Sequence, residues 1–283
     1  MKETNYLSPA EIAAHTSSVA VKKANTSWEK LLVLGFLAGA FIAFASEGST
    51  MAAFNLLANP ATYGLGKALA GTIFGTGLMF VIIAGGELFT GNTLMVVGVL
   101  DKRITVRAML RNWMLVYAGN FIGSIFVAWM MAYSGLFHSG ADMLGGMTIR
   151  IAASKTTLDF GPALVLGLMC NWLVCLAVWM AYGAKDVTGK ILAIFFAIWL
   201  FITSGFEHSV ANMYYIPAGI FAKANAAYAS ASGLSAEALG ALNGGMFLVR
   251  NLLPVTLGNM LGGGLFVGVA YWFTYLRPAK KEG

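Results

Sequence analysis

The sequence has little charge and few of the residues that build metal or disulfide sites. Only 11% of its 283 residues are Asp, Glu, Lys or Arg, whereas soluble domains carry roughly 25% of such residues. Its two cysteines, Cys170 and Cys175, lie in one apolar run on nearly opposite faces of a helix, and only three histidines are present. We therefore exclude a water-soluble globule, and we expect no disulfide, metal ion or cofactor.

Apolar residues are abundant instead, at 58% of the chain, with a mean hydropathy of +0.74. Long uncharged runs cover residues 31–46, 68–86, 112–141, 160–184, 191–206 and 251–276. Since a membrane span needs about 20 apolar residues, these runs predict an all-α membrane protein with six transmembrane helices in a lipid bilayer. The net charge of +6 lies in loops without interleaved aromatic residues, so we expect no nucleic-acid partner.

The basic residues predict the orientation of the chain in the membrane. Threading the chain through six spans puts 13 of them on the side of both termini: Lys2, Lys22, Lys23, Lys30, Lys102, Arg103, Arg107, Arg111, Lys185, Lys190, Arg277, Lys280 and Lys281. The other side holds five: Lys67, Arg150, Lys155, Lys223 and Arg250. Cytoplasmic loops carry the excess of Lys and Arg, so we expect a multi-pass protein of the inner or plasma membrane with both termini in the cytoplasm.

An internal repeat organises the chain. The pattern RNxxxVxxGNxxG occurs at 111–123 and again at 250–262, an offset of 139 residues. The pattern Glu-x4-Asn recurs at 87–92 and 207–212, an offset of 120 residues. The chain therefore contains two copies of a three-span unit. Because three crossings reverse the side of the membrane, we expect an inverted 3+3 repeat, an architecture of many channels and transporters.

These patterns predict one transmembrane channel domain over residues 1–283. We expect three-span units at 28–133 and 159–277, preceded by an N-terminal cytoplasmic helix within 1–27. The alanine-rich face of that helix leaves two alternatives open. It lies along the cytoplasmic membrane surface, or it forms a plain cytoplasmic lid.

The second and fifth spans are predicted to be broken helices. Glu87 and Glu207 each follow an apolar run and precede a second, shorter one, and Asn92 and Asn212 follow in the repeat pattern. Non-helical backbone survives at membrane depth only where it is buried in protein or lines a cavity, so paired breaks indicate the permeation path. We expect the glutamates to order the breaks by accepting hydrogen bonds from exposed backbone amides. The alternative is that they are satisfied structural groups.

His208 directly follows Glu207 at the predicted break of the fifth span. An imidazole there can donate a hydrogen bond or a proton to a passing anion. The alternative is again a satisfied structural group. No metal-ligand partner accompanies it, so we interpret His208 as a pore residue.

The motifs at these positions resemble those of a known family. GELFTGN at 86–92, RNWMLVYAGN at 111–120 and SGFEHSVANMYYIPAGI at 204–220 are similar to segments of the formate/nitrite transporters, over essentially the whole chain. The resemblance implies an aquaporin-like protomer and a homopentamer with one pore per protomer and none on the fivefold axis. It also implies formate, nitrite or hydrosulfide as the anion.

The resemblance further implies roles for single residues. The central histidine falls on His208 and the vestibule lysine on Lys155, with Asn171 and Thr90 as further polar pore residues. The implied constriction comprises Phe74, Leu78, Leu88, Phe89 and Phe201. From the residues alone, Phe74 and Leu78 share one helical face that ordinary packing would also explain. Lys155 would otherwise be a solvated loop charge.

Three classes of function remain open. We favour a passive channel or proton-coupled translocator for small monovalent anions of weak acids, with formate first and nitrite or hydrosulfide next. In this mechanism Lys155 attracts the anion, and His208 shares a proton so that the neutral acid crosses the apolar constriction. A neutral-solute channel is disfavoured, because the aquaporin-like sequence Asn59-Pro60-Ala61 occurs once and is interpreted as a turn. No motif supports an enzyme or a receptor.

Overall fold

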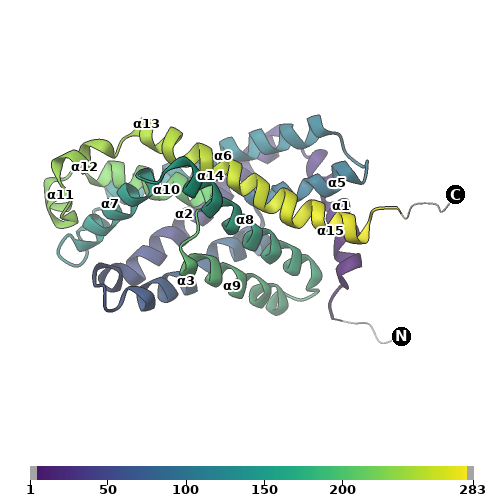
Figure 1. The fold of residues 1–283 in the computed structure, drawn as a ribbon, viewed down its shortest axis with the longest axis horizontal. Coiled ribbons are helices and arrows are strands. Elements are labelled where there is room, and N and C mark those ends of the chain that lie inside the picture. Colours follow the sequence, from purple (N-terminus) through teal and green to yellow (C-terminus); the bar gives the residue numbers. More distant parts are fainter. Residues whose placement is uncertain (1–4, 279–283) are drawn as a thin grey trace.

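The computed structural model describes residues 5–278, which are almost entirely helical (Figure 1). Residues 1–4 of the predicted N-terminal segment, and Lys280 and Lys281, lie outside the described residues. Six helical stretches are long and apolar enough to cross a membrane, as predicted. They are Trp28–Ala58 (α2), Tyr63–Gly85 (α3, Tyr63–Met79, continued by a π-helical turn, Phe80–Gly85), Val106–Ser134 (α6), Phe160–Gly183 (α8), Val187–Ser204 (α9) and Gly244–Tyr275.

The sixth span is one continuous helical stretch with two π-helical segments. It runs through α13 (Gly244–Met246), a π segment (Phe247–Leu252), α14 (Leu253–Met260), a second π segment (Leu261–Val269) and α15 (Ala270–Tyr275). Shorter helices complete the fold: α1 (Pro9–Ala24), α4 (Phe89–Asn92), α5 (Val96–Leu100), α7 (Met143–Thr156), α10 (Ser209–Ala222), α11 (Ala226–Ser232) and α12 (Ala236–Ala241). Short 3-10 turns lie at Thr93–Met95 and Leu136–His138.

Helical structure stops twice inside the apolar part of the chain. The helix that begins with α3 ends at Gly85, and α4 begins at Phe89; α9 ends at Ser204, and α10 begins at Ser209. Gly85 has φ +105° and Gly205 has φ +81°. These left-handed conformations favour glycine, because a Cβ atom would clash with the backbone. The two glycines therefore let the chain leave its helix at equivalent places in the two halves.

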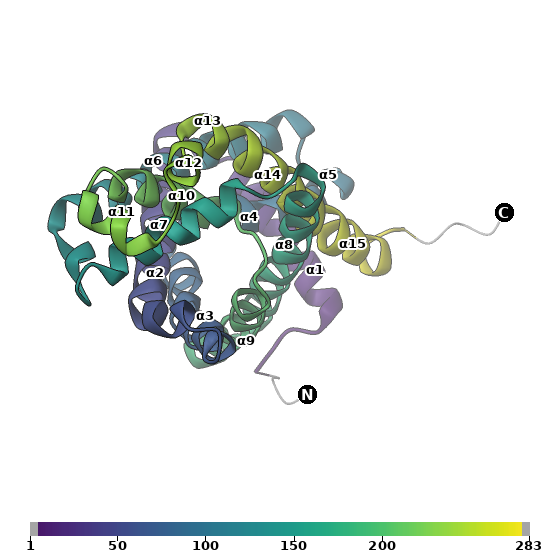
Figure 2. The same cartoon turned by 60° about the vertical axis from the view of Figure 1, so that its left-hand side comes forward.

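The ends of the described chain lie together. Helices α1 and α15 occupy the end of the molecule opposite to α11 and α12 (Figures 1 and 2). An even number of crossings produces this arrangement. Helix α1 is held against the bundle, because the amide of Leu7 donates to the Gly183 carbonyl (2.8 Å) and Ser17 Oγ donates to Asp101 Oδ2 (2.5 Å). This packing is the one that the lid alternative for the N-terminal helix requires.

Glycines allow the long helices to approach one another closely. A Cβ atom on Gly123 of α6 would overlap the Phe36 carbonyl of α2, and one on Gly262 would overlap the Leu168 carbonyl of α8. Gly123 and Gly262 are separated by the repeat offset of 139 residues. Small residues at such contacts let helix backbones meet, as is common between membrane helices. The repeated motif therefore encodes one backbone contact in each half.

We predict that Gly262→Ala lowers the thermal stability of the detergent-solubilised protein. The added methyl group meets the backbone of α8, which cannot move aside as a flexible side chain would, and overpacking of this kind costs roughly 1–3 kcal/mol. Gly161→Ala is the matched control, because a Cβ atom on Gly161 meets nothing within 4 Å. Equal melting temperatures for Gly262→Ala and Gly161→Ala would contradict the close contact.

Candidate functional site

A charged cluster holds the break of the second span. Lys23 Nζ of α1 donates to both oxygens of Glu87, at 2.8 Å each, and Asn92 Nδ2 donates to Glu87 Oε2 at 2.7 Å. Asn92 Nδ2 also donates to Asn112 Oδ1 (2.8 Å), and Asn112 Nδ2 donates to the Lys23 carbonyl (3.3 Å). Glu87 is thus neutralised by Lys23 and bonded by Asn92, the asparagine of the same Glu-x4-Asn pattern.

The break of the fifth span has an equivalent cluster. Lys155 Nζ of α7 donates to Glu207 Oε1 at 2.7 Å, and Asn212 Nδ2 donates to Glu207 Oε2 at 2.6 Å. Asn212 Nδ2 also donates to Asn251 Oδ1 (2.7 Å), and Asn251 Nδ2 donates to the Lys155 carbonyl (3.0 Å). The Lys155 and Glu207 side chains are only 14% and 7% exposed. Lys155 is therefore a half-buried, paired residue on a helix rather than a solvated loop charge.

One backbone amide at each break is bonded by an asparagine, not by a glutamate. The Phe89 amide donates to Asn120 Oδ1 at 2.9 Å, and Asn120 Nδ2 donates back to the carbonyls of Glu87 and Gly35, both at 2.8 Å. The prediction that the glutamate side chains accept these amides is therefore wrong. A glutamate that is already bonded to Lys23 and Asn92 leaves the amide to a shorter side chain on α6.

The second half repeats this bonding pattern. The Ser209 amide donates to Asn259 Oδ1 (2.9 Å), and Asn259 Nδ2 donates to the carbonyls of Gly167 (2.7 Å) and Glu207 (3.0 Å). Asn259 follows Asn120 by the repeat offset of 139 residues. The repeated motif contained both asparagines, but the sequence pattern alone did not predict their role at the breaks.

His208 joins the two breaks. Its Nδ1 accepts a hydrogen bond from the Ala211 amide (3.1 Å), and its Nε2 lies 2.9 Å from Thr90 Oγ1. An amide can only donate, so neutral His208 carries its proton on Nε2 and donates it to the Thr90 hydroxyl. That hydroxyl keeps its own hydrogen for another acceptor. His208 is 3% exposed, and its ring lies 6.1 Å from the Phe201 ring.

All five expected constriction residues are buried apolar side chains. The Phe74 and Phe201 rings, from α3 and α9, meet edge to face with centroids 5.6 Å apart. Leu78 and Leu88 are each 2% exposed. Phe89 begins α4 at the second-span break, but its ring packs against Trp113 (6.0 Å) and Tyr117 (4.8 Å) of α6. The structure therefore does not bring Phe89 to Phe74 and Phe201.

Asn171 connects three elements instead of projecting free into a pore. Its Nδ2 donates to the Thr90 carbonyl (3.1 Å), to Thr93 Oγ1 (3.1 Å) and to the Asn259 carbonyl (2.6 Å). It thereby fixes the carbonyl of the residue that bonds His208. Cys175 Sγ contacts the same Thr90 carbonyl (3.3 Å), and both cysteines are fully buried and free.

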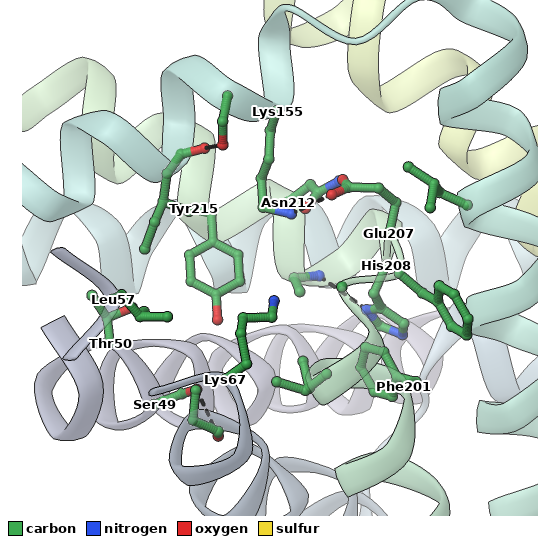
Figure 3. Close-up of a pocket in the computed structure, with 18 of the residues that line it drawn as sticks. Ser49, Thr50, Leu57, Lys67, Lys155, Phe201, Glu207, His208, Asn212 and Tyr215 are labelled. Carbon is green, nitrogen blue, oxygen red and sulfur yellow. Dashed lines mark hydrogen bonds and ion pairs between the residues drawn. The ribbon is translucent and has the colours of Figure 1, made fainter. Parts of the chain in front are cut away.

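A cavity of about 430 Å³ opens beside the break of the fifth span (Figure 3). The walls come from α2, α3, α7, α8, α9 and α10 and from the segment between α9 and α10. Lys155, Glu207, His208 and Phe201 all line it. The lining residues that were not predicted include Lys67, Arg150 and Tyr215. Lys155 Nζ lies 5.3 Å from the centroid of the Tyr215 ring, a cation–π distance. The only sequence feature that indicated Lys67 is its position immediately before an apolar run.

This architecture is that of a polytopic helical membrane protein with two interrupted helices and a charge-lined cavity. The sequence model of the formate/nitrite transporter family matches residues 10–273, and the chain belongs to that family. A probable formate transporter of Methanothermobacter thermautotrophicus is 39% identical over 97% of this chain and 99% of its own length. A formate channel of Bacillus thuringiensis is 40% identical over 95% and 96%. A solved pentameric formate channel with formate bound has a TM-score of 0.78 and 38% identity, covering 88% of this chain and 98% of its own.

We predict that Lys155→Met destabilises the protein and that adding Glu207→Gln restores much of the loss. Removing one partner of a buried ion pair leaves an uncompensated charge and costs roughly 3–5 kcal/mol, and water in the cavity should place this pair at the lower end. The thermal unfolding of both variants in detergent measures the effect.

Arg250→Met is the matched control for that prediction. Arg250 and Asp159 form a long pair at 3.8 Å with side chains 51% and 83% exposed. The loss of such an exposed pair changes stability by at most about 1 kcal/mol. If Lys155→Met melts like Arg250→Met, the Lys155–Glu207 pair does not support the fold.

Proposed function

We propose that the protein is a transmembrane channel or translocator for small monovalent anions of weak acids, with formate as the favoured substrate. Nitrite and hydrosulfide are the alternatives of similar size and charge. The single observation that carries the proposal is the cavity, which presents cationic side chains and is lined by His208, the residue that bonds Thr90. The formate transporters and channels among the relatives support this choice of substrate.

The apolar residues beyond the cavity explain why a proton is needed. A bare anion loses its hydration when it passes closely packed side chains such as Phe74, Leu78 and Phe201, and burial of an unpaired charge is costly. At neutral pH a carboxylic acid with a pKa near about 4 is almost entirely ionised, so the bulk solution supplies little neutral acid. A proton shared inside the passage removes this barrier. Direction then follows the gradients of substrate and proton.

The geometry of His208 supports one path for that proton. The Nε2–H bond points to Thr90 Oγ1, so Thr90 presents its hydroxyl hydrogen to the anion while His208 polarises it. A second proton on His208 would have to sit on Nδ1, where the Ala211 amide now donates. Charging His208 therefore breaks the hydrogen bond at the N-terminus of α10. Proton exchange and the local structure of the break are coupled.

We also infer the assembly and the membrane. The described surface exposes large apolar side chains on several spans, among them Val33, Phe44, Ile122, Phe126 and Phe196. Such a surface suits contact with lipid and with other protomers. The pentameric relative supports a homopentamer. The Lys and Arg distribution supports insertion in the inner or plasma membrane with both termini cytoplasmic, and the equivalent bonding at 28–133 and 159–277 supports an inverted repeat.

We predict that His208→Asn removes the histidine-dependent step from the pH profile of formate flux. The Asn Oδ1 atom can accept the Ala211 amide, and Asn is a favourable residue at the start of a helix, so assembly should be retained. Asn does not titrate between mildly acidic and mildly basic pH. Labelled formate flux into liposomes, measured for both proteins at matched incorporation, tests this expectation.

Thr90→Val provides the companion measurement, because it keeps the volume of the side chain and removes the hydroxyl that accepts from His208. We expect Thr90→Val to lower the formate flux at neutral pH to about the same extent as His208→Asn lowers it. An unchanged pH midpoint in His208→Asn would defeat the relay. Flux of nitrite or hydrosulfide but not formate in the wild-type protein would change the substrate and leave the site in place.

A further inference from the structure

The cavity contains two lysines whose surroundings differ. Lys155 Nζ is bonded to Glu207 at 2.7 Å and lies over the Tyr215 ring. Its positive charge is cancelled by a carboxylate in direct contact. At the distance of an approaching anion, a cancelled pair acts as a dipole whose field falls off faster than that of a single charge. Lys155 is therefore poorly placed to attract or bind an anion.

Lys67 extends into the same cavity from α3 and points between Tyr215 and His208 (Figure 3). Within residues 5–278 its amine makes no hydrogen bond and no ion pair. A Cβ atom on Gly205 would lie 3.6 Å from Lys67 Nζ, so the ammonium group sits beside the fifth-span break. It is a half-buried cation with its three N–H donors unused.

Three other lysines of the protein find acceptors in its own chain. Lys23 and Lys155 each bond a glutamate, and Lys223 Nζ donates to the carbonyls of Leu239 (2.8 Å) and Leu242 (2.5 Å). Partly burying an ammonium group without an acceptor costs free energy. The described part of the protein supplies no acceptor for the Lys67 ammonium group. An acceptor that enters the cavity from solution would satisfy it.

The charge balance of the cavity leads to the same conclusion. The charged residues that line it are Lys67, Arg150, Lys155 and Glu207, which sum to a net charge of +2. After Lys155 and Glu207 cancel, Lys67 and Arg150 carry all of that excess. Arg150 is exposed and belongs to the mouth. Lys67 is half-buried and its ammonium group sits beside the fifth-span break, so it is the less exposed of the two lining cations that lack a partner among the described residues.

We propose that Lys67, and not Lys155, binds the substrate anion in this cavity, and that Lys155 serves to hold Glu207. The ligand class is a small oxyanion such as a carboxylate or nitrite, whose oxygens accept the charge-assisted hydrogen bonds of an ammonium group. The identity of that anion rests on the proposed function. The site itself rests on the unpaired amine and on the cancelled charge of Lys155.

The test compares formate influx into liposomes for Lys67→Met, Arg150→Gln and the wild-type protein over a range of formate concentrations. The Lys67→Met variant keeps the length of the side chain and removes the charge. We expect its half-saturating concentration to rise at least about tenfold, as for loss of a hydrogen bond to a charged group. Arg150→Gln, which removes the same charge from the mouth, should raise it only about two- to threefold, and high salt should abolish that difference.

A second variant allows the charge at position 67 to be chosen after the protein has folded and assembled. Lys67→Cys is treated with a thiol reagent that adds either an ammonium group or a sulfonate group. Cys170 and Cys175 are fully buried and should not react, and the treated wild-type protein controls for this. The ammonium group should return the half-saturating concentration towards the wild-type value, whereas the sulfonate should raise it further.

Several outcomes would overturn the proposal. One is a half-saturating concentration that is the same in Lys67→Met and the wild type, or the same after either reagent. Another is a larger rise in a folded Lys155→Met protein. Failure of the Lys67 variants to assemble also counts against it, because an unpaired amine should not be needed for folding.

Binding of labelled formate to the detergent-solubilised protein separates the Lys67 site from the proposed channel function. If the wild-type protein binds formate, Lys67→Met does not, and liposomes show no flux, the site is retained and the channel proposal is defeated.

Discussion

The fold depends on one constraint: a helix that breaks inside a membrane frees backbone groups that lipid cannot bond, and the protein must supply partners for them. Asn120 and Asn259 meet this need, since each accepts one amide and donates to two carbonyls around its break. Their reach is short, so α6 and α14 must lie directly against the breaks. The glycines of the same motif, at 123 and 262, permit that distance.

The same constraint explains two helices, α1 and α7, that are not among the six membrane spans. Helices α1 and α7 supply Lys23 and Lys155, and each lysine neutralises the glutamate of one break. A lone carboxylate there would be costly, and a lysine delivered by a short adjoining helix offsets that cost without placing a second charge inside a span. Helix α1 therefore serves the break of the second span as α7 serves the break of the fifth.

The sequence allowed the features that depend on local pattern to be predicted. The six spans follow from the length of uncharged runs, and the repeat and the two breaks follow from motifs that recur at fixed offsets. Partners across the fold could not be predicted in this way, because residue spacing does not say which side chains meet. Lys155 was therefore expected as a vestibule charge and not as the partner of Glu207. Phe89 has the residue type of a constriction, yet α6 offers its ring two aromatic neighbours.

Comparison of the two halves separates the residues of the fold from those of the site. Glu87 and Glu207, with their asparagines, match at equivalent positions, and Tyr117 and Thr256, 139 residues apart, bond each other at 2.8 Å where the halves meet. The residues assigned to transport do not match: at the offset of 120, His208 corresponds to Leu88, Thr90 to Val210 and Lys67 to Val187. Equal halves can build only equal clusters. A cavity that has no counterpart in the other half therefore requires such departures from the repeat: Lys67 and His208 line it at the fifth-span break, and Thr90 reaches His208 from the second-span break.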